Sequence, residues 1–207
     1  MAPRRKKASS YHHGDLRQAL LDAAIEAVKE GGFHALSLRD CARRAGVSHA
    51  APYRHFEDKR ALLDAIALEG FLMLGARGQA AMARYTDPED RRDAYGVAYV
   101  VWAMEHPAHL RVMFSAPLED PPEELQQAAD FTFELLLGAC AGVDQTGDPQ
   151  VVALGRWAHV HGLASLCVDG RVPEELVDSL AKVEALAWGV LRPDGEPPQP
   201  DPPRGTP

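Results

Sequence analysis

The 207-residue chain lacks several common features, and each absence excludes a class of protein. Its three cysteines, Cys41, Cys140 and Cys167, lie far apart and form no CxxC pair, which argues against a disulfide framework and a structural zinc site. We expect each to be a small, buried apolar residue. No uninterrupted apolar run approaches the roughly 20 residues of a membrane span, and no signal-peptide pattern follows the basic start. A cytoplasmic protein without membrane contact is therefore expected.

Sequence motifs of common enzymes and metal sites are also absent. The chain contains no GxSxG, HExxH, GxGxxG or Walker-type phosphate loop, and no carboxylate pair in an apolar context suggests acid–base catalysis. Histidines cluster only at His12–His13, at His106 and His109, and at His159 and His161. Positions two apart on a helix face different ways, and a proline disturbs the middle pair. We therefore expect no catalytic residue, no metal ligand and no cofactor.

No stretch alternates apolar and polar residues as a strand does, whereas apolar residues recur at helical spacing along most of the chain. The predicted fold is all-α, with an N-terminal three-helix helix-turn-helix domain, a C-terminal helical bundle and about nine helices in total. The expected segments are a basic flexible arm over 1–14, a first helical domain over 15–60, a second helical domain over 61–192, and a disordered proline-rich tail over 193–207.

The chain does contain a helix-turn-helix pattern at 37–60, SLRDCARRAGVSHAAPYRHFEDKR. Ser37 followed three residues later by Asp40 predicts a capped helix, and Gly46 suits the left-handed conformation after a helix end. The hydroxyl of Ser48 is then expected to cap a second helix over HAAPYRHF. The proline of that segment falls in its first turn, where we expect the missing N–H to cost little.

Charge is divided unevenly along the chain. Residues 1–60 hold 12 Lys or Arg and 7 Asp or Glu, whereas residues 61–207 hold 10 and 23, so the net charge of −8 combines +5 with −13. The basic part carries the helix-turn-helix pattern, and the acidic remainder would be repelled by DNA. This division favours double-stranded DNA as a partner of the first part.

Basic residues stand at the starts of helices in this region. Arg39 lies in the first turn of one predicted helix, and Lys59 and Arg60 open the next, which Asp58 would cap. Such cations oppose the helix dipole by about 0.3–1 kcal/mol each, which makes sense if a phosphate shares the site. The alternative is that they are solvated surface residues beside a structural corner.

The second helix of the pattern supplies candidates for base contact. Arg54 has the chemistry to bind guanine, Ala50 or Ala51 to touch a thymine methyl group, and Tyr53 to contact phosphate, with His55 beside them. Residues 1–10, MAPRRKKASS, are expected to be disordered in isolation. They have two interpretations, an arm that follows the DNA backbone or minor groove and a solubilising tail, and their position beside the pattern favours the arm.

We call the helix-turn-helix domain at 15–60 the head. After it, helical patterns are predicted over about 58–85, 89–106, 108–114, 123–142, 150–168 and 174–191. The first is unusually long, so we expect it to connect the head to a larger bundle. The last two each have an apolar or small-residue face that we expect to be buried against a partner. The residues assigned to that interface are Gly155, Ala158, Gly162, Leu176, Leu180, Val183 and Ala187.

The bulky residues of the middle helices have two interpretations, a plain core and a cavity for an apolar effector. In the second interpretation the tyrosine hydroxyls, a histidine or a glutamate would supply polarity. The residues selected for this cavity are Phe71, Tyr95, Tyr99, Trp102, His106, Met113, Phe114, Phe131 and Glu134.

Residues 16–68 resemble the DNA-binding domain of TetR-type transcriptional regulators. The resemblance includes AGVS, the aromatic pair Tyr53 and Phe56, and Lys59 before an apolar helix, all in order. The lead-in YHHGDLR and the segment WAHVHGLASL at 157–166 resemble the branch with a Trp-His-Gly C-terminal domain.

This resemblance implies a homodimer whose last two helices form a four-helix interface, with an effector cavity among the middle helices. It also implies that residues 15–60 are a helix-turn-helix DNA-binding domain, that residues 61–192 are an effector-binding and dimerisation domain, and that a small ligand releases the protein from its operator. By position, the implied DNA contacts are Arg39, Ser48, His49, Tyr53, Arg54 and Lys59. The run Ala50-Ala51-Pro52 departs from the family, in which many members have a turn containing Thr or Leu, so the base-reading residues stay open.

Three hypotheses follow from the sequence. The first is a ligand-responsive, DNA-binding repressor that recognises a palindromic operator as a dimer. The second is an all-helical small-molecule binding protein whose head contacts another protein. The third, an enzyme, has no supporting constellation of residues. The division of charge and the resemblance both favour the first.

Overall fold

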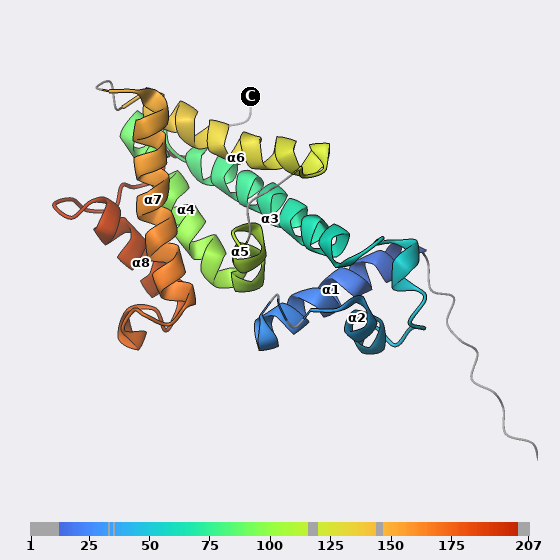
Figure 1. Cartoon of the computed structure of the whole chain (residues 1–207). Helices are drawn as coiled ribbons and strands as arrows, with labels where there is room; N and C mark the ends of the chain where they lie inside the picture. The colour runs from blue at the N-terminus through green and yellow to red at the C-terminus, as the bar shows by residue number, and fades with distance from the viewer. Residues whose placement is uncertain (1–12, 33, 35, 116–119, 144–146, 203–207) are drawn as a thin grey trace, which may run out of the picture. The chain divides into compact units, whose positions relative to one another are not determined.

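The computed structural model of the chain describes residues 13–32, 34, 36–115, 120–143 and 147–202 (Figure 1). Within these residues the secondary structure consists of eight α-helices and two short 3₁₀ helices, without strands. The all-α prediction is therefore confirmed. The basic arm lies almost entirely outside the described residues. The chain divides into two compact units, Met1–Ile66 and Ala67–Pro207, so the boundary falls inside a helix and not at residue 60.

The first unit packs α1 (His13–Gly31) against α2 (Leu38–Arg44), which contacts the 3₁₀ helix η2 (Pro52–Arg54). Apolar positions recur every three or four residues on α1, so they share one face and form a core with α2 and the start of the next helix. The large buried members of this core are Leu20, Leu21, Val28, Leu36, Leu38, Phe56, Leu62 and Ile66.

The helix α3 (Lys59–Met82) contributes residues to both units. Asp58 caps it as predicted, because its carboxylate accepts a hydrogen bond from the backbone N–H of Ala61 at 2.8 Å. Farther along, a Cβ atom added at Gly78 would collide with the ring of Tyr95. Glycine is therefore needed where this tyrosine lies against the helix backbone.

The second unit is built around α4 (Pro88–Glu105), twelve consecutive residues of which are buried. Its neighbours are α5 (Pro107–Met113), α6 (Glu123–Ala141), α7 (Pro149–Val168) and α8 (Leu180–Leu191) (Figure 1). A helix with neighbours on several sides is apolar around most of its circumference. Consequently α4 presents side chains to a cavity on one side and to the last two helices on another.

A buried group of charges fastens the end of α8 to the start of α4. Asp93, whose side chain is 3% exposed, accepts hydrogen bonds from Arg92 Nε at 2.8 Å and from Arg192 Nε at 2.7 Å. Arg192 also donates from Nη2 to Asp90 Oδ1 at 2.7 Å. Buried charges persist only when they are paired and hydrogen-bonded in this way.

The region after α7 differs from its prediction. The single helix expected over 174–191 is interrupted, with a 3₁₀ helix, η3 (Glu174–Leu176), before α8 begins at Leu180. Ser179 is extended, and its hydroxyl accepts a hydrogen bond from the backbone N–H of Lys182. A serine in this position favours the start of a new helix. Apolar residues continue at helical spacing on both sides of Ser179, so their spacing alone does not reveal the break.

The proline-rich tail was expected to be disordered from residue 193. Its described part extends to residue 202, and the backbone N–H of Asp201 donates to the carbonyl of Arg84 at 2.9 Å. This part of the tail therefore contacts the segment that follows α3.

The three cysteines, Cys41, Cys140 and Cys167, are all buried, as predicted. Burial raises the pKa of the Cys41 thiol to about 11. The thiol therefore stays protonated at neutral pH and acts as a small apolar side chain.

Candidate DNA-binding head and effector cavity

The corner after α2 has the geometry that the sequence predicted. The Ser37 hydroxyl accepts a hydrogen bond from the backbone N–H of Asp40 at 3.1 Å, so Ser37 is the N-cap of α2. Gly46 lies at φ +69°, the left-handed conformation that favours glycine. The backbone N–H of Val47 then donates to the carbonyl of Ala42 at 3.0 Å and closes the corner. Both the cap and the glycine stop are confirmed.

The second helix of the head is shorter than predicted. In place of a helix over HAAPYRHF, backbone bonds run from Ala51 N to Ser48 O and from Arg54 N to Ala51 O, the spacing of a 3₁₀ helix. The residue at the N-cap of η2 is Ala51, so the prediction of Ser48 as the cap was wrong. Pro52 is the cause, because an α-helix capped at Ser48 needs its first i→i−4 bond from that position.

The head exposes most of the side chains assigned to DNA contact. The exposed members are Arg39, Ser48, His49, Ala50, Tyr53 and Arg54. Tyr53 is 53% exposed, whereas Phe56 is 3% exposed and belongs to the core. His55 and Lys59 are half-buried, and Lys59 Nζ donates to the carbonyl of His34 at 3.2 Å. Tyr53 is thus the aromatic side chain of this segment available to an outside partner.

The arginines of the head differ in their freedom to bind phosphate. Asp40 accepts from Arg43 Nη2 and from Arg44 Nε, each at 2.6 Å. These hydrogen bonds, the one from Arg44 foremost, lower the pKa of the Asp40 carboxyl. Arg39 and Arg54, by contrast, have no ion-pair partner among the described residues. Arg39 and Arg54 are therefore better placed for an anionic ligand than the α2 pair.

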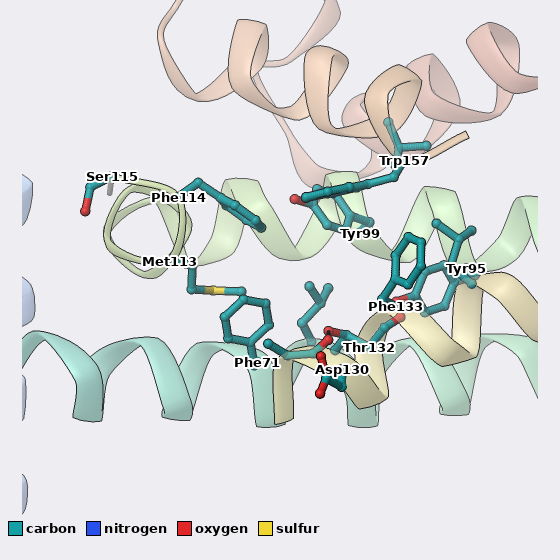
Figure 2. Close-up of a pocket in the computed structure, with 14 residues that line it drawn as sticks. Phe71, Tyr95, Tyr99, Met113, Phe114, Ser115, Asp130, Thr132, Phe133 and Trp157 are labelled. Carbon is teal, nitrogen blue, oxygen red and sulfur yellow. Dashed lines mark hydrogen bonds between the residues drawn. The ribbon is translucent and has the colours of Figure 1, made fainter. Parts of the chain in front are cut away.

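The second unit contains a cavity of about 610 Å³ with walls from α3, α4, α5, α6 and α7 (Figure 2). This volume lies within the range of about 300–1,000 Å³ that takes small organic ligands. Aromatic side chains from α3, α4, α6 and α7, together with Phe114 just after α5, make up much of its wall. The lining residues are Phe71, Leu74, Tyr95, Tyr99, Met113, Phe114, Ser115, Ala129, Asp130, Thr132, Phe133, Leu136, Trp157 and Val160.

The tyrosine hydroxyls of this wall already have partners. Tyr95 donates to the carbonyl of Thr132 at 2.7 Å, and the hydroxyl of Tyr99 lies 2.7 Å from His161 Nδ1. Burial raises the pKa of both phenols and lowers the pKa of His161, so all three groups are neutral at pH 7. Asp130 is the only acidic or basic residue among the described lining residues.

The residues selected for an effector cavity divide between the wall of this cavity and other places. Five of the nine selected residues line the cavity, namely Phe71, Tyr95, Tyr99, Met113 and Phe114. Four lie outside the described lining, namely Trp102, His106, Phe131 and Glu134. Trp102 is 1% exposed, and its ring packs 5.5 Å from that of His106 and 6.5 Å from that of His109. These rings form a separate cluster at the end of α4.

The other two residues outside the lining, Phe131 and Glu134, lie on α6 away from the face that lines the cavity. Phe131 is 41% exposed and Glu134 is exposed. Four of the five α6 residues that line the cavity follow an i, i+3, i+4, i+7 pattern, which is one face of a helix: Ala129, Thr132, Phe133 and Leu136. The fifth, Asp130, is exposed at the edge of that face. The buried residues Leu125 and Ala128 lie on this same face of the helix. Their spacing therefore indicates which face of α6 is turned inward.

Trp157 was also missing from the predicted lining. Its ring lies 5.7 Å from Phe114 and 5.9 Å from His161, centroid to centroid. His161 packs 4.6 Å from Phe114 as well, so the segment WAHVHGLASL supplies both an aromatic wall and a hydrogen bond to α4. In the sequence, this segment resembles one branch of the TetR-type family. That resemblance gives no indication that Trp157 lines the cavity.

The residues assigned to the dimer interface divide between the surface of the chain and its core. Gly155 and Ala158 are exposed and Gly162 is half-buried, and a Cβ added at either glycine would meet no atom within 4 Å. Leu176 and Leu180 are 44% and 45% exposed. Val183 and Ala187 are fully buried within the chain, because they occupy the face of α8 that packs against α4. These last two positions therefore belong to the protomer's own core.

Among the described residues, α7 alone has the length and apolar composition of a helix that can cross a membrane, with a mean hydropathy of 1.3. It packs against α4 and α6, as the core helix of a globular protein also does. Its outward face carries Val151, Leu154 and Leu166, all at least half exposed. The part of the chain that the structure describes contains no group of three His, Cys, Asp or Glu side chains placed to hold a metal ion.

Two families of known proteins match the two units. The family of bacterial regulatory proteins called the tetR family matches residues 20–66, and the tetracyclin repressor-like C-terminal domain family matches residues 92–187. Tetracycline repressor protein class D of Escherichia coli is 42% identical over 53 residues, which are 26% of this chain and 24% of that protein. The regulator BetI of Serratia proteamaculans is 47% identical over 49 residues, 24% and 25% of the two chains. The chain thus matches these relatives over about a quarter of their length.

Solved structures resemble the chain over most of its length. A protein of unknown function from Rhodococcus sp. RHA1 is 34% identical, with a TM-score of 0.70 and coverage of 90% of this chain and 98% of that one. A regulatory protein in the tetR family from Rhodococcus RHA1 is 25% identical, with a TM-score of 0.67 and coverage of 86% and 95%. FadR of Bacillus subtilis, solved with stearoyl-CoA, is 14% identical with a TM-score of 0.68 over 84% and 95%, which shows a shared fold. With its helix-turn-helix head and the tetracyclin repressor-like domain that follows, the chain belongs to the tetR family of bacterial transcriptional regulators.

Proposed function

We propose that the protein is a ligand-responsive repressor that binds a palindromic operator as a homodimer and is released by a small, largely apolar effector. The observation that carries this proposal is the presence, in one chain, of an exposed helix-turn-helix head and a ligand-sized apolar cavity, with α3 contributing to both units. We propose a cytoplasmic location and no enzymatic role, because the matched families consist of transcriptional regulators.

The distribution of charge supports the orientation of the protein on DNA. The head carries the positive balance of +5 and the rest carries −13. Tyr53 and Arg54 are exposed at η2, and Arg39 is exposed at the start of α2. These three residues are the proposed centre of the contact, with Arg54 as the candidate base reader and Tyr53 as a phosphate ligand.

The surface of the last two helices supports dimerisation. Val151, Leu154 and Leu166 are exposed along α7, and small residues at Gly155 and Ala158 lie between them. A contiguous exposed apolar surface is typical of an interface, and small residues permit close approach of a second helix. We propose that the same surface of a second copy covers it, as expected for a two-fold symmetric dimer.

Release is explained by a shift between two conformations. Two heads that bind adjacent major grooves must stand about one helical turn, roughly 34–36 Å, apart. An effector that binds more tightly to a conformation with a different spacing lowers operator affinity by that difference in binding free energy, and by no more. We propose that Trp157 and Tyr99 contact the effector, because both line the cavity. Both also contact His161 on α7: the ring of Trp157, on the same helix, packs near its ring, and the hydroxyl of Tyr99, on α4, lies 2.7 Å from its Nδ1.

Selection of genomic DNA fragments with the full chain tests the proposal. We expect enrichment of fragments that contain an inverted repeat, with binding that falls steeply as salt rises because phosphate contacts release counterions. A screen for compounds that release the enriched fragment then tests the effector. If no fragment is enriched at low salt, the head does not recognise DNA and the proposal fails.

The alternative is an all-helical small-molecule binding protein whose head contacts another protein. It predicts no enriched DNA fragment and retention of ligand binding by the cavity. The exposed Tyr53 fits either kind of partner, whereas the cations at Arg39 and Arg54 favour DNA.

A further inference from the structure

We propose that the cavity of the second unit selects hydrophobic effectors that carry an ammonium group and excludes carboxylates and other organic anions. This inference rests on the proposed function and names the chemical class of its effector. It depends on the charge and the ring content of the cavity wall and on the charges of the helix that forms one side of it.

The described wall contains acidic charge and no basic residue. Asp130 is its single acidic residue, and lysine and arginine are absent from the described lining. His161, which bonds to Tyr99 behind the wall, has a pKa lowered by burial and stays neutral. A buried anion needs a cation or several hydrogen-bond donors, and this wall offers neither in sufficient number.

The described hydroxyl groups add little to anion binding. Tyr95 already donates to the carbonyl of Thr132, and the Thr132 hydroxyl donates to the carbonyl of Ala129 at 2.7 Å. Ser115 donates to the carbonyl of Val112 at 3.0 Å. A carboxylate in the cavity would therefore lose its water without gaining an equivalent set of donors.

Six aromatic rings favour a cation in the same space. The rings in the lining are those of Phe71, Tyr95, Tyr99, Phe114, Phe133 and Trp157. The face of an aromatic ring is negative, so it attracts an ammonium group and repels an anion. Figure 2 shows these side chains converging from opposite sides of the cavity.

Asp130 supplies a full negative charge beside these rings. It lies on α6 near Thr132 (Figure 2). One of its oxygens accepts a hydrogen bond from Gln126 Nε2 at 2.7 Å. Because Asp130 is exposed, it is placed at the rim, where a ligand's charged end can keep part of its hydration. The helix α6 carries four acidic residues, Glu123, Glu124, Asp130 and Glu134, and no lysine or arginine.

Two arginines that lie near this wall in the sequence line a different site. Arg92 and Arg156 line a separate cavity of only about 10 Å³, which also contains Asp93. Leu136 and Val160 line both cavities. Arg92 belongs to the buried charge group between α4 and α8.

Calorimetric titration with three probes of equal chain length tests this selectivity. The probes are decyltrimethylammonium, 1-decanol and decanoate, each below its aggregation concentration at pH 7.5, added to the full chain. We expect the ammonium probe to bind about ten-fold or more tightly than decanoate, with decanol between them. Trp157→Ala should weaken the binding of all three probes, which locates them in the cavity.

A matched pair of variants isolates the rim carboxylate. Asp130→Asn should weaken the ammonium probe about three-fold and leave decanol unchanged, because a charge pair at an exposed rim is weak. Glu134→Gln removes the same charge from α6 outside the described lining and should have a smaller effect. Unchanged thermal unfolding of both variants shows that they fold.

Three results would overturn the inference. One is decanoate binding as tightly as the ammonium probe, and another is Asp130→Asn having no larger effect than Glu134→Gln. Failure of all three probes to bind would also overturn it. None of these results touches the proposed function, which fails separately if genomic selection enriches no DNA fragment.

Discussion

Each of the two units holds an aspartate between two arginines, but in different surroundings. In the head, Asp40 accepts hydrogen bonds from Arg43 and Arg44, and its side chain is 28% exposed. Water and salt screen such a pair, so it adds little to stability. Its main effect is to hold Arg43 and Arg44 in ion pairs within the head. Arg39 and Arg54 are exposed arginines of the head that have no ion-pair partner among the described residues.

In the second unit the same combination is buried. Asp93 lies between two arginines: Arg92, its neighbour on α4, and Arg192, at the end of α8. Removal of one buried partner leaves an uncompensated charge, so this group holds α8 in place. Similar charge patterns thus organise a surface for an outside partner in one unit and an interior in the other.

The largest expected effect is the loss of the buried group. Asp93→Ala should lower the free energy of unfolding by about 3–5 kcal/mol, because Arg92 and Arg192 lose their shared partner. The matched change Asp40→Ala should have a much smaller effect on stability. Urea unfolding followed by circular dichroism measures both, and equal losses would show that the two groups do not differ as described.

The next effect concerns DNA. Arg54→Ala should weaken binding to the selected operator by about 1–3 kcal/mol if Arg54 reads a base. Arg43→Ala removes an equal charge from the head, but Arg43 is held by Asp40 and should matter less. Fluorescence anisotropy at one fixed salt concentration measures both affinities. Arg43→Ala proving the more damaging would contradict the assignment of the contact to η2.

A smaller effect is expected from the packing of α3 against the cavity wall. Gly78→Ala should destabilise the protein by about 1–3 kcal/mol, because the added methyl group collides with the ring of Tyr95. Gly138→Ala on α6 meets no atom within 4 Å and should be neutral or stabilising by up to about 1 kcal/mol. Thermal unfolding of the two variants tests whether Tyr95 is held as described, and equal effects would argue against it.

The smallest effect is a pH dependence from the cavity wall. Burial lowers the pKa of His161, so the unfolded chain binds a proton more readily than the folded chain. Stability should therefore fall as pH drops through about 6.5, the ordinary pKa of histidine, and His161→Gln should lose less between pH 7.5 and 5.5 than the natural chain. His159→Gln, on the exposed side of α7, is the control and should lose as much as the natural chain. A loss unchanged in His161→Gln would assign the effect to other groups.

Local signals were the most predictable part of the structure. The Ser37 cap, the Gly46 corner and the Asp58 cap each depend on a few neighbouring residues, and all three occur as expected. The second helix of the head failed at Pro52, where the count of positions from Ser48 shows that the first α-helical hydrogen bond needs the missing N–H. The four-residue spacing between Ser48 and Pro52 is therefore a sequence signal for the short η2.

Positions that depend on tertiary packing were harder to predict. Choosing Phe131 over Phe133 selected the exposed face of α6, although apolar rings occur on both. Val183 and Ala187 are apolar and were assigned to a partner, but α4 buries them within the same chain. An apolar helix face predicts burial, and only the arrangement of neighbouring helices decides whether the partner is internal or external.

The central claim is that occupation of the cavity and binding of the operator oppose each other. Its most direct test is the affinity of a cavity-bound compound, measured by calorimetry with the free protein and with the protein saturated by its operator fragment. We expect the compound to bind the DNA-bound protein more weakly by a factor of about 5–150, and the compound to lower operator affinity by the same factor. Equal affinity for the free and the DNA-bound protein would contradict it.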